Sequence, residues 1–235
     1  MNAILHHGRC RHLSLCLMLA LGWLGGSSCS RAQKLVPLDI PLPAEAFKGT
    51  PSDEKPDPSI EPLSQTTNRP PFLAPAGAAN VALHKKVTSS ATNASPEELA
   101  KITDGEKQSE EENIVMLRKG SQWVQIDLGS PQDIFAIVVW HNHNTAKVYH
   151  GVIVQVADGP DFTPAQNART LFNNDVGNKA GLGVGKDREY FETYMGKLID
   201  AKGARARYVR LYSNGSTAAS FNEYIEVEVY GRPAQ

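Results

Sequence analysis

The sequence predicts an all-β fold, an antiparallel jelly-roll β-sandwich, and two stretches near the C-terminus carry that prediction. Residues 206–215 (ARYVRLYSNG) and 224–231 (YIEVEVYG) alternate apolar and polar side chains with a period of two, as half-buried strands do. In the second stretch we expect Ile225, Val227 and Val229 to share the face that meets the core.

The other elements follow in chain order, separated by clusters of Asn, Asp, Gly and Pro. Apolar alternation or continuous apolar runs predict further strands at residues 81–89, 122–128, 134–140, 149–157 and 170–172. One short helix is expected, because Ser95, Pro96 and Glu98 match a cap, a first helical position and a capping box. We expect that helix to end near Ile102.

The first thirty residues have the order of a secretory signal. Basic residues at 6–12 precede the apolar run 13–24, and small residues follow at 25–28, so residues 1–30 are predicted to be a signal peptide. The run is too short to favour spanning a bilayer. Cys29 follows Gly-Ser-Ser, which resembles a bacterial lipobox, and lipidation of Cys29 and ordinary cleavage nearby remain alternatives.

Residues 31–76 are predicted to be a disordered linker, because residues 33–75 hold ten of the fifteen prolines and show no sustained period. Residues 77–235 are then expected to form one β-sandwich domain. The three cysteines are Cys10, Cys16 and Cys29, so the sequence predicts that this domain folds without a disulfide.

The charge balance excludes a partner chosen by its charge alone. There are 24 basic and 25 acidic residues, for a formal net charge of −1. No long-range field favours nucleic acid or an anionic membrane surface. A membrane is expected to be contacted only through a lipid on the N-terminus.

Three further motifs, NVALHKKVTSS (80–90), ITDG (102–105) and WVQIDLG (123–129), precede the C-terminal strands in that order. Together these segments resemble a discoidin domain, also called the coagulation factor type C domain, of the galactose-binding-like superfamily. The resemblance covers residues 80–231, about two-thirds of the chain. It implies a sandwich whose loops at one end bind a ligand.

A histidine-rich cluster, HNHN at residues 141–144, follows directly on a buried-looking strand. His141 and His143 would share a face of an extended chain, and His150 lies beyond a short turn. Three interpretations remain open at this point. The imidazoles could bind sugar hydroxyls, hold a metal such as zinc, or only cap the end of the strand.

Sugar-binding members of the resembled family use histidine, arginine, asparagine and an aromatic residue in their end loops. The resemblance therefore assigns ligand binding to six positions of this sequence: His141, His143, Asn144, Tyr149, Asn222 and, on a neighbouring loop, Arg118. The expected partner is a glycan or a cell-surface polysaccharide. Many bacterial members also hold a structural calcium ion, and the matching positions here are Asp104 and Glu226. No other cofactor is expected.

These observations predict an exported, non-catalytic module that binds carbohydrate in the cell envelope or outside the cell. No nucleophile elbow or metalloprotease helix is present, and no residue is predicted to be catalytic. Two alternatives stay open. One is a structural module that contacts envelope proteins, and the other is a metal-dependent hydrolase using His141, His143 and His150. The glycine- and asparagine-rich residues 173–193 are expected to form a long loop at the rim of the sandwich.

Overall fold

A computed structural model describes residues 33–46, 55–62 and 69–234, so the predicted signal peptide and Cys29 lie outside the described residues. In the described residues, ten strands run in the order β1 (Leu35–Pro37), β2 (Leu73–Pro75), β3 (Ala79–Asn80), β4 (Lys86–Ser89), β5 (Val115–Leu117), β6 (Gln122–His141), β7 (Ile153–Ala157), β8 (Arg169–Asn173), β9 (Lys197–Ser213) and β10 (Asn222–Pro233). The helices are short: α1 (Pro96–Ala100), η1 (Lys101–Thr103), η2 (Glu111–Asn113) and η3 (Pro164–Gln166). Every paired strand is antiparallel, which confirms the all-β prediction.

Helix α1 begins as the sequence predicts. The Glu98 amide donates to the Ser95 hydroxyl, and the Ser95 amide donates to the Glu98 carboxylate, so the capping box is complete. Among the described residues, no helix is long and apolar enough to cross a membrane.

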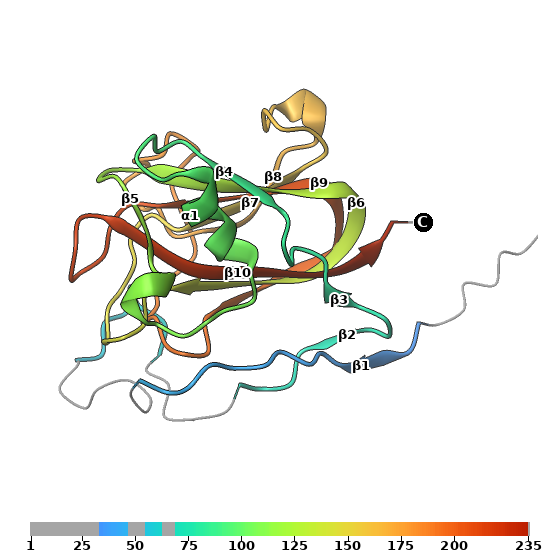
Figure 1. Ribbon diagram of the computed structural model, residues 1–235, viewed down its shortest axis with the longest axis horizontal. Coiled ribbons are helices and arrows are strands. Elements are labelled where there is room, and N and C mark those ends of the chain that lie inside the picture. The colour runs from blue at the N-terminus through green and yellow to red at the C-terminus, as the bar shows by residue number, and fades with distance from the viewer. Residues whose placement is uncertain (1–32, 47–54, 63–68, 235) are drawn as a thin grey trace, which may run out of the picture. The chain divides into compact units, whose positions relative to one another are not determined.

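Strand β6 runs through both layers of the sandwich, because it bends midway. Its first half pairs with β4 and the end of β9, and its second half pairs with β10 and the start of β9. The register shifts between Asp127 and Gln132, where Gly129 has a φ of 86° that favours glycine. Strands β7 and β8 extend the first layer, and β3 and β5 flank β10 in the second (Figure 1).

The core lies between these layers and is built by alternation. Val124 and Ile126 of β6 face Val227 and Val229 of β10, and all four are buried in one apolar cluster. The cluster also holds residues of β7 and β9, among them Val154, Val156, Val209 and Leu211. Each strand contributes every second residue, which is the pattern that predicted it.

Strand β10 departs from the predicted alternation at Ile225. The register shifts between Tyr224, which faces His141, and Glu226, which faces Trp140. This bulge turns Ile225 onto the outer face of the layer, where it packs with Trp140. The prediction that Ile225 shares the face of Val227 is therefore wrong.

The described parts of residues 31–76 also differ from the predicted linker. Strand β1 pairs with β2, and Leu38, Ile40 and Phe72 pack on an outer cluster that contains Trp140 and Ile225. The proline-rich composition indicated a segment that packs on nothing, but these apolar side chains cover the outer face of β6 and β10. Figure 1 shows β1 and β2 beside the layer that contains β10.

We expect Phe72→Ala to lower the free energy of unfolding by about 2 kcal/mol, because a half-buried ring would leave the outer cluster. Chemical denaturation followed by tryptophan fluorescence measures this change. Leu73→Ala is the matched control, since the Leu73 side chain is 53% exposed. Equal stabilities of the two variants would contradict the packing of this segment on the sandwich.

Candidate functional site

The bend in β6 brings the two ends of that strand to the same end of the sandwich. Gln122 at its start pairs with Ser213, and His141 at its finish pairs with Tyr224. The loops that precede β6, follow β6 and join β9 to β10 therefore gather there. We call this region the loop end, formed by residues 118–121, 142–152 and 214–221.

Asn222 ties two of these loops together. Its Nδ2 donates to the backbone oxygens of Arg118 and Gly120 at 2.7 and 2.9 Å, and its Oδ1 accepts from the Gly215 amide at 2.8 Å. The side chain is fully buried and has three strong partners. Asn222, predicted to bind ligand, instead positions the loops that would do so.

His141 lies below the loops and is fully buried. Its Nδ1 is 3.0 Å from Oε2 of Glu192, and its ring stacks on Tyr149 with centroids 4.3 Å apart. Glu192 and Tyr190 belong to the long loop 174–196 between β8 and β9, which folds over this end of the core. That loop was predicted from its glycines and asparagines, but its cover over His141 was not.

His143 and Tyr149 are also inside the protein. Nε2 of His143 lies 3.0 Å from the Lys107 backbone oxygen, and its amide donates to the Ser109 hydroxyl. The Tyr149 hydroxyl donates to Oε2 of Glu223 at 2.9 Å. Burial, with the neighbouring carboxylate of Glu223, raises the pKa of Tyr149 well above its ordinary value.

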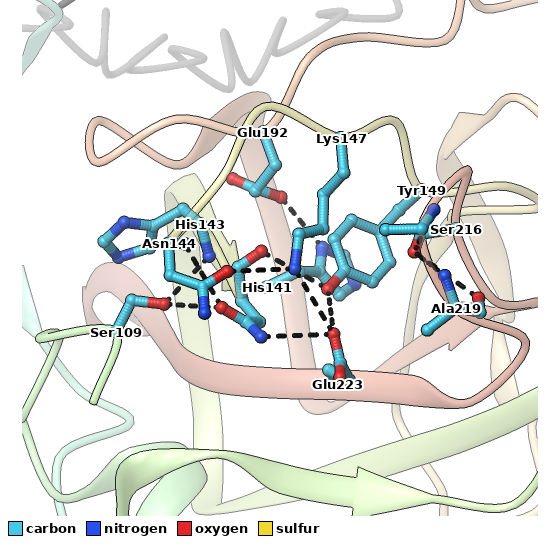
Figure 2. A network of polar contacts seen from close by, with 12 residues as sticks. Ser109, His141, His143, Asn144, Lys147, Tyr149, Glu192, Ser216, Ala219 and Glu223 are labelled. Atoms are coloured by element: carbon cyan, nitrogen blue, oxygen red, sulfur yellow. Dashed lines mark hydrogen bonds and ion pairs between the residues drawn. The ribbon is translucent and has the colours of Figure 1, made fainter. Parts of the chain in front are cut away.

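A continuous polar network joins these side chains (Figure 2). Asn142 accepts from Ser109 at 2.7 Å and donates to Glu223 at 3.2 Å. Lys147 donates to Oδ1 of Asn144 at 3.1 Å and lies 3.7 Å from Oε2 of Glu223. Most of the network is structural, because Asn142, Lys147, Tyr149 and Glu223 are buried and bond to one another, while Asn144 is its exposed member.

His150, the third histidine of the metal site considered above, has a different partner from His141 and His143. Nδ1 of His150 lies 2.7 Å from Oε1 of Glu189, whereas His141 meets Glu192 and His143 meets a backbone oxygen. In the described part of the chain, no group of three or more His, Cys, Asp or Glu side chains is placed to hold a metal ion.

The exposed groups at the loop end are different from most of those predicted. Asn144 and Arg118 are exposed, as a ligand-binding role requires. Phe221 was missed: its ring is 39% exposed, and Nζ of Lys119 lies 5.1 Å from its centroid. The sequence held a signal for this exposure, because Phe221 follows a run of small residues, 216–220, and comes shortly before the predicted strand 224–231.

The two predicted calcium ligands, Asp104 and Glu226, lie on the opposite side of β10 from the core. Asp104 is exposed, and its Oδ1 accepts from the Glu106 amide at 2.8 Å. Glu226 is fully buried, and neither of its carboxylate oxygens has a hydrogen-bond partner. Burial raises the pKa of Glu226 to about 9; the nearby Gly105 amide and Lys107 oppose this shift, and the Glu228 and Asp104 carboxylates add to it.

No protein-family model matches the sequence, and no curated protein matches it. Several solved structures are similar to the chain. A chitosan-binding module of a chitosanase/glucanase from Paenibacillus sp. IK-5 is 20% identical, with a TM-score of 0.44 over 65% of this chain and 99% of the module. A CBM32 of AlyQ in complex with 4,5-unsaturated mannuronic acid is 18% identical, with a TM-score of 0.43 over 61% and 92%. A Clostridium perfringens CBM32 in complex with GlcNAc-α-1,4-galactose is 15% identical, with a TM-score of 0.46 over 67% and 96%.

Glu226 makes the stability of the domain depend on pH. The folded-state pKa of about 9 lies above the ordinary value of 4.5, so the stabilising contribution is complete below pH 4.5. It is lost progressively as the pH rises from 4.5 to about 9, so most of it is gone by pH 8. We expect Glu226→Gln to be more stable than the natural protein at pH 8, by on the order of 3 kcal/mol, and indistinguishable from it near pH 4.

Thermal unfolding across this pH range, in EDTA, measures the difference. Glu97→Gln on the exposed side of α1 is the matched control and should follow the natural protein. Parallel pH curves for Glu226→Gln and the natural protein would show that Glu226 is not the group that titrates.

Proposed function

We propose that this domain is a non-catalytic carbohydrate-binding module and that the loop end is its binding surface. The observation that carries the proposal is Phe221, an exposed aromatic ring whose centroid lies 5.1 Å from Nζ of Lys119. Arg118, the residue before Lys119, is also exposed. An aromatic face packs against the apolar face of a sugar ring, while cationic side chains donate hydrogen bonds to its hydroxyls. The proposal rests on this surface and not on the similarity to known modules.

The surface is held in place before a ligand arrives. Asn222 joins the loop that holds Arg118 to the loop that holds Phe221. Val148 and Thr217 form two hydrogen bonds: the Val148 amide donates to the Thr217 hydroxyl, and the Thr217 amide donates to the Val148 oxygen. Groups that are already ordered lose little conformational entropy on binding. We therefore assign direct contact to Phe221, Lys119, Arg118 and Asn144.

In this proposal His141, His143, Tyr149 and Asn222 position the loops. Their ring and amide groups bond inside the protein, as described above, so a sugar could reach them only if the loops separated. The same separate partners argue against a hydrolase built on the three histidines. A glycan or cell-surface polysaccharide is the proposed partner, and contacts with envelope proteins are the alternative.

We also propose that the protein is exported. The order of basic, apolar and small residues in 1–30 supports a signal peptide, and Cys29 supports a lipid anchor as the alternative to a free N-terminus. An anchored copy would present the loop end at the cell surface. Mass spectrometry of the mature N-terminus distinguishes a lipidated cysteine from ordinary cleavage.

We expect Phe221→Ala to weaken binding about 3- to 10-fold for any glycan that the natural protein binds, since an aromatic contact contributes about 0.5–1.5 kcal/mol. A glycan array identifies the ligand, and calorimetry with that glycan measures the loss. Phe135→Ala is the matched control, because Phe135 lies on the second half of β6 near its bend and contacts Arg232. If folded protein gives no signal on the array, protein contacts become the favoured function. If Phe221→Ala and Phe135→Ala lose affinity equally, the glycan site is not at Phe221.

A structural calcium ion is proposed at Asp104 and Glu226. The two unpartnered, buried oxygens of Glu226 fit a hard cation, which prefers carboxylate oxygens. When bound, calcium would neutralise the carboxylate that burial otherwise keeps protonated. Backbone oxygens would have to supply the remaining ligands, since no third acidic or histidine side chain joins these two among the described residues.

We expect calcium at about 100 times its Kd to stabilise the natural protein by about 2.7 kcal/mol and to leave Glu226→Gln unchanged. Thermal unfolding at pH 7.5, with calcium or with EDTA, tests this. Magnesium serves as the control cation, since it requires a tighter octahedral site. Equal melting temperatures with calcium and EDTA would remove the metal from the proposal.

A further inference from the structure

A short segment before the domain binds the long loop as a peptide ligand would. Ile60 forms a parallel bridge with Glu189. The Glu61 amide donates to the Glu189 oxygen at 2.7 Å, and the Glu189 amide donates to the Ser59 oxygen at 3.1 Å. Residues 57–61 therefore pair with the backbone of the loop through one parallel bridge, a minimal form of the strand addition that is common in peptide recognition.

The groove selects an acidic residue at one position. Glu61 forms an ion pair with Nζ of Lys197. That ammonium lies 4.9 Å from the ring centroid of Tyr190 and 5.2 Å from that of Phe172, so two aromatic faces hold it in place. We call the backbone of residues 188–190 together with Lys197 the peptide groove.

The Glu189 side chain does not compete for this groove. Its Oε1 bonds to Nδ1 of His150 at 2.7 Å, which leaves its backbone amide and oxygen for pairing. Glu192, three residues on, donates its amide to the Lys147 oxygen and so anchors the same loop to the sandwich. The edge that receives the segment is thus fixed from the side that faces the core.

Hydrogen bonds within the segment set its conformation. The Asp57 carboxylate accepts from the Ser59 amide at 2.7 Å and from the Ser59 hydroxyl at 2.6 Å, and the Asp57 oxygen accepts from the Ile60 amide at 3.1 Å. Prolines at 56, 58 and 62 lack an amide hydrogen and limit pairing to a single bridge. A turn that forms within the segment does not depend on which molecule the segment belongs to.

The contact is small enough to exchange. Among the described residues it includes two backbone hydrogen bonds and one ion pair, and a cleft of about 500 Å³ remains between the segment and Arg188. Intramolecular docking is favoured mainly by the high effective concentration of a tethered segment. The groove itself is equally complementary to an identical segment from outside.

We propose that this groove binds an extended acidic peptide segment and that its partner is residues 57–61 of a second copy of this chain. Each copy carries both the groove and the segment, so a reciprocal exchange satisfies two grooves at once with two-fold symmetry. The natural chain docks its own segment, and exchange begins when that docking is broken.

Charge reversal tests the exchange in the full chain. Glu61→Lys and Lys197→Glu each place like charges together within one molecule, so each variant alone should be a monomer with its segment released. Mixed in equal amounts, they restore opposite charges only between molecules. We expect the mixture to double its mass in light scattering after size-exclusion chromatography. The double variant, Glu61→Lys with Lys197→Glu, restores the pair within one chain and should stay monomeric.

A labelled synthetic peptide of residues 55–62 gives the second measurement, by fluorescence anisotropy. We expect it to bind Glu61→Lys at least about tenfold more tightly than the natural chain, whose tethered segment competes for the groove, and not to bind Lys197→Glu. A mixture that stays monomeric while both variants melt cooperatively would overturn the exchange. Peptide binding with a monomeric mixture would assign the groove to an acidic segment of another protein. Absence of both would show that residues 57–61 are only a fixed part of the fold.

Discussion

The bend of β6 is the constraint on which the rest of this structure depends. One strand of twenty residues supplies a central position to both layers, so the layers cannot separate without breaking the strand. The same bend returns the strand to the end where it began. The loop end therefore owes its existence to a turn at its far side, near Gly129, and not to any residue of the loops.

Bringing polar residues to the top of a closed core creates a second constraint. His141 pairs with Tyr224 on a neighbouring strand, and an unpaired polar group at that depth costs about 1–3 kcal/mol. Nδ1 of His141 has a partner, whereas its Nε2 has none. The loop 174–196 supplies Glu192 to His141, and β10 supplies Glu223 to Tyr149. His141 and Tyr149, whose residue types suggested ligand binding, therefore support the loop end from below.

The sequence allowed the fold to be predicted wherever alternation was regular, and its failures have identifiable causes. The first half of β9 was missed, because Lys202 and Gly203 have positive φ values that interrupt the period. Ile225 was placed on the wrong face, since a bulge shifts the register without altering residue types. The site was harder to predict. Residue type makes His141 polar and Phe221 apolar, but only the three-dimensional structure shows that the histidine is buried and the phenylalanine exposed.

The loop 174–196 links the two proposed surfaces, because its neighbouring residues face opposite ways. Glu192 turns inward to His141, while the backbone of Glu189 pairs outward with the segment 57–61. Exchange of that segment between copies would leave the edge paired by the same sequence, so the inner contacts would not change. It would also join two loop ends in one assembly. Two shallow sites that each bind weakly gain avidity when one linkage presents both to a surface, which gives pairing of the copies a consequence for glycan binding.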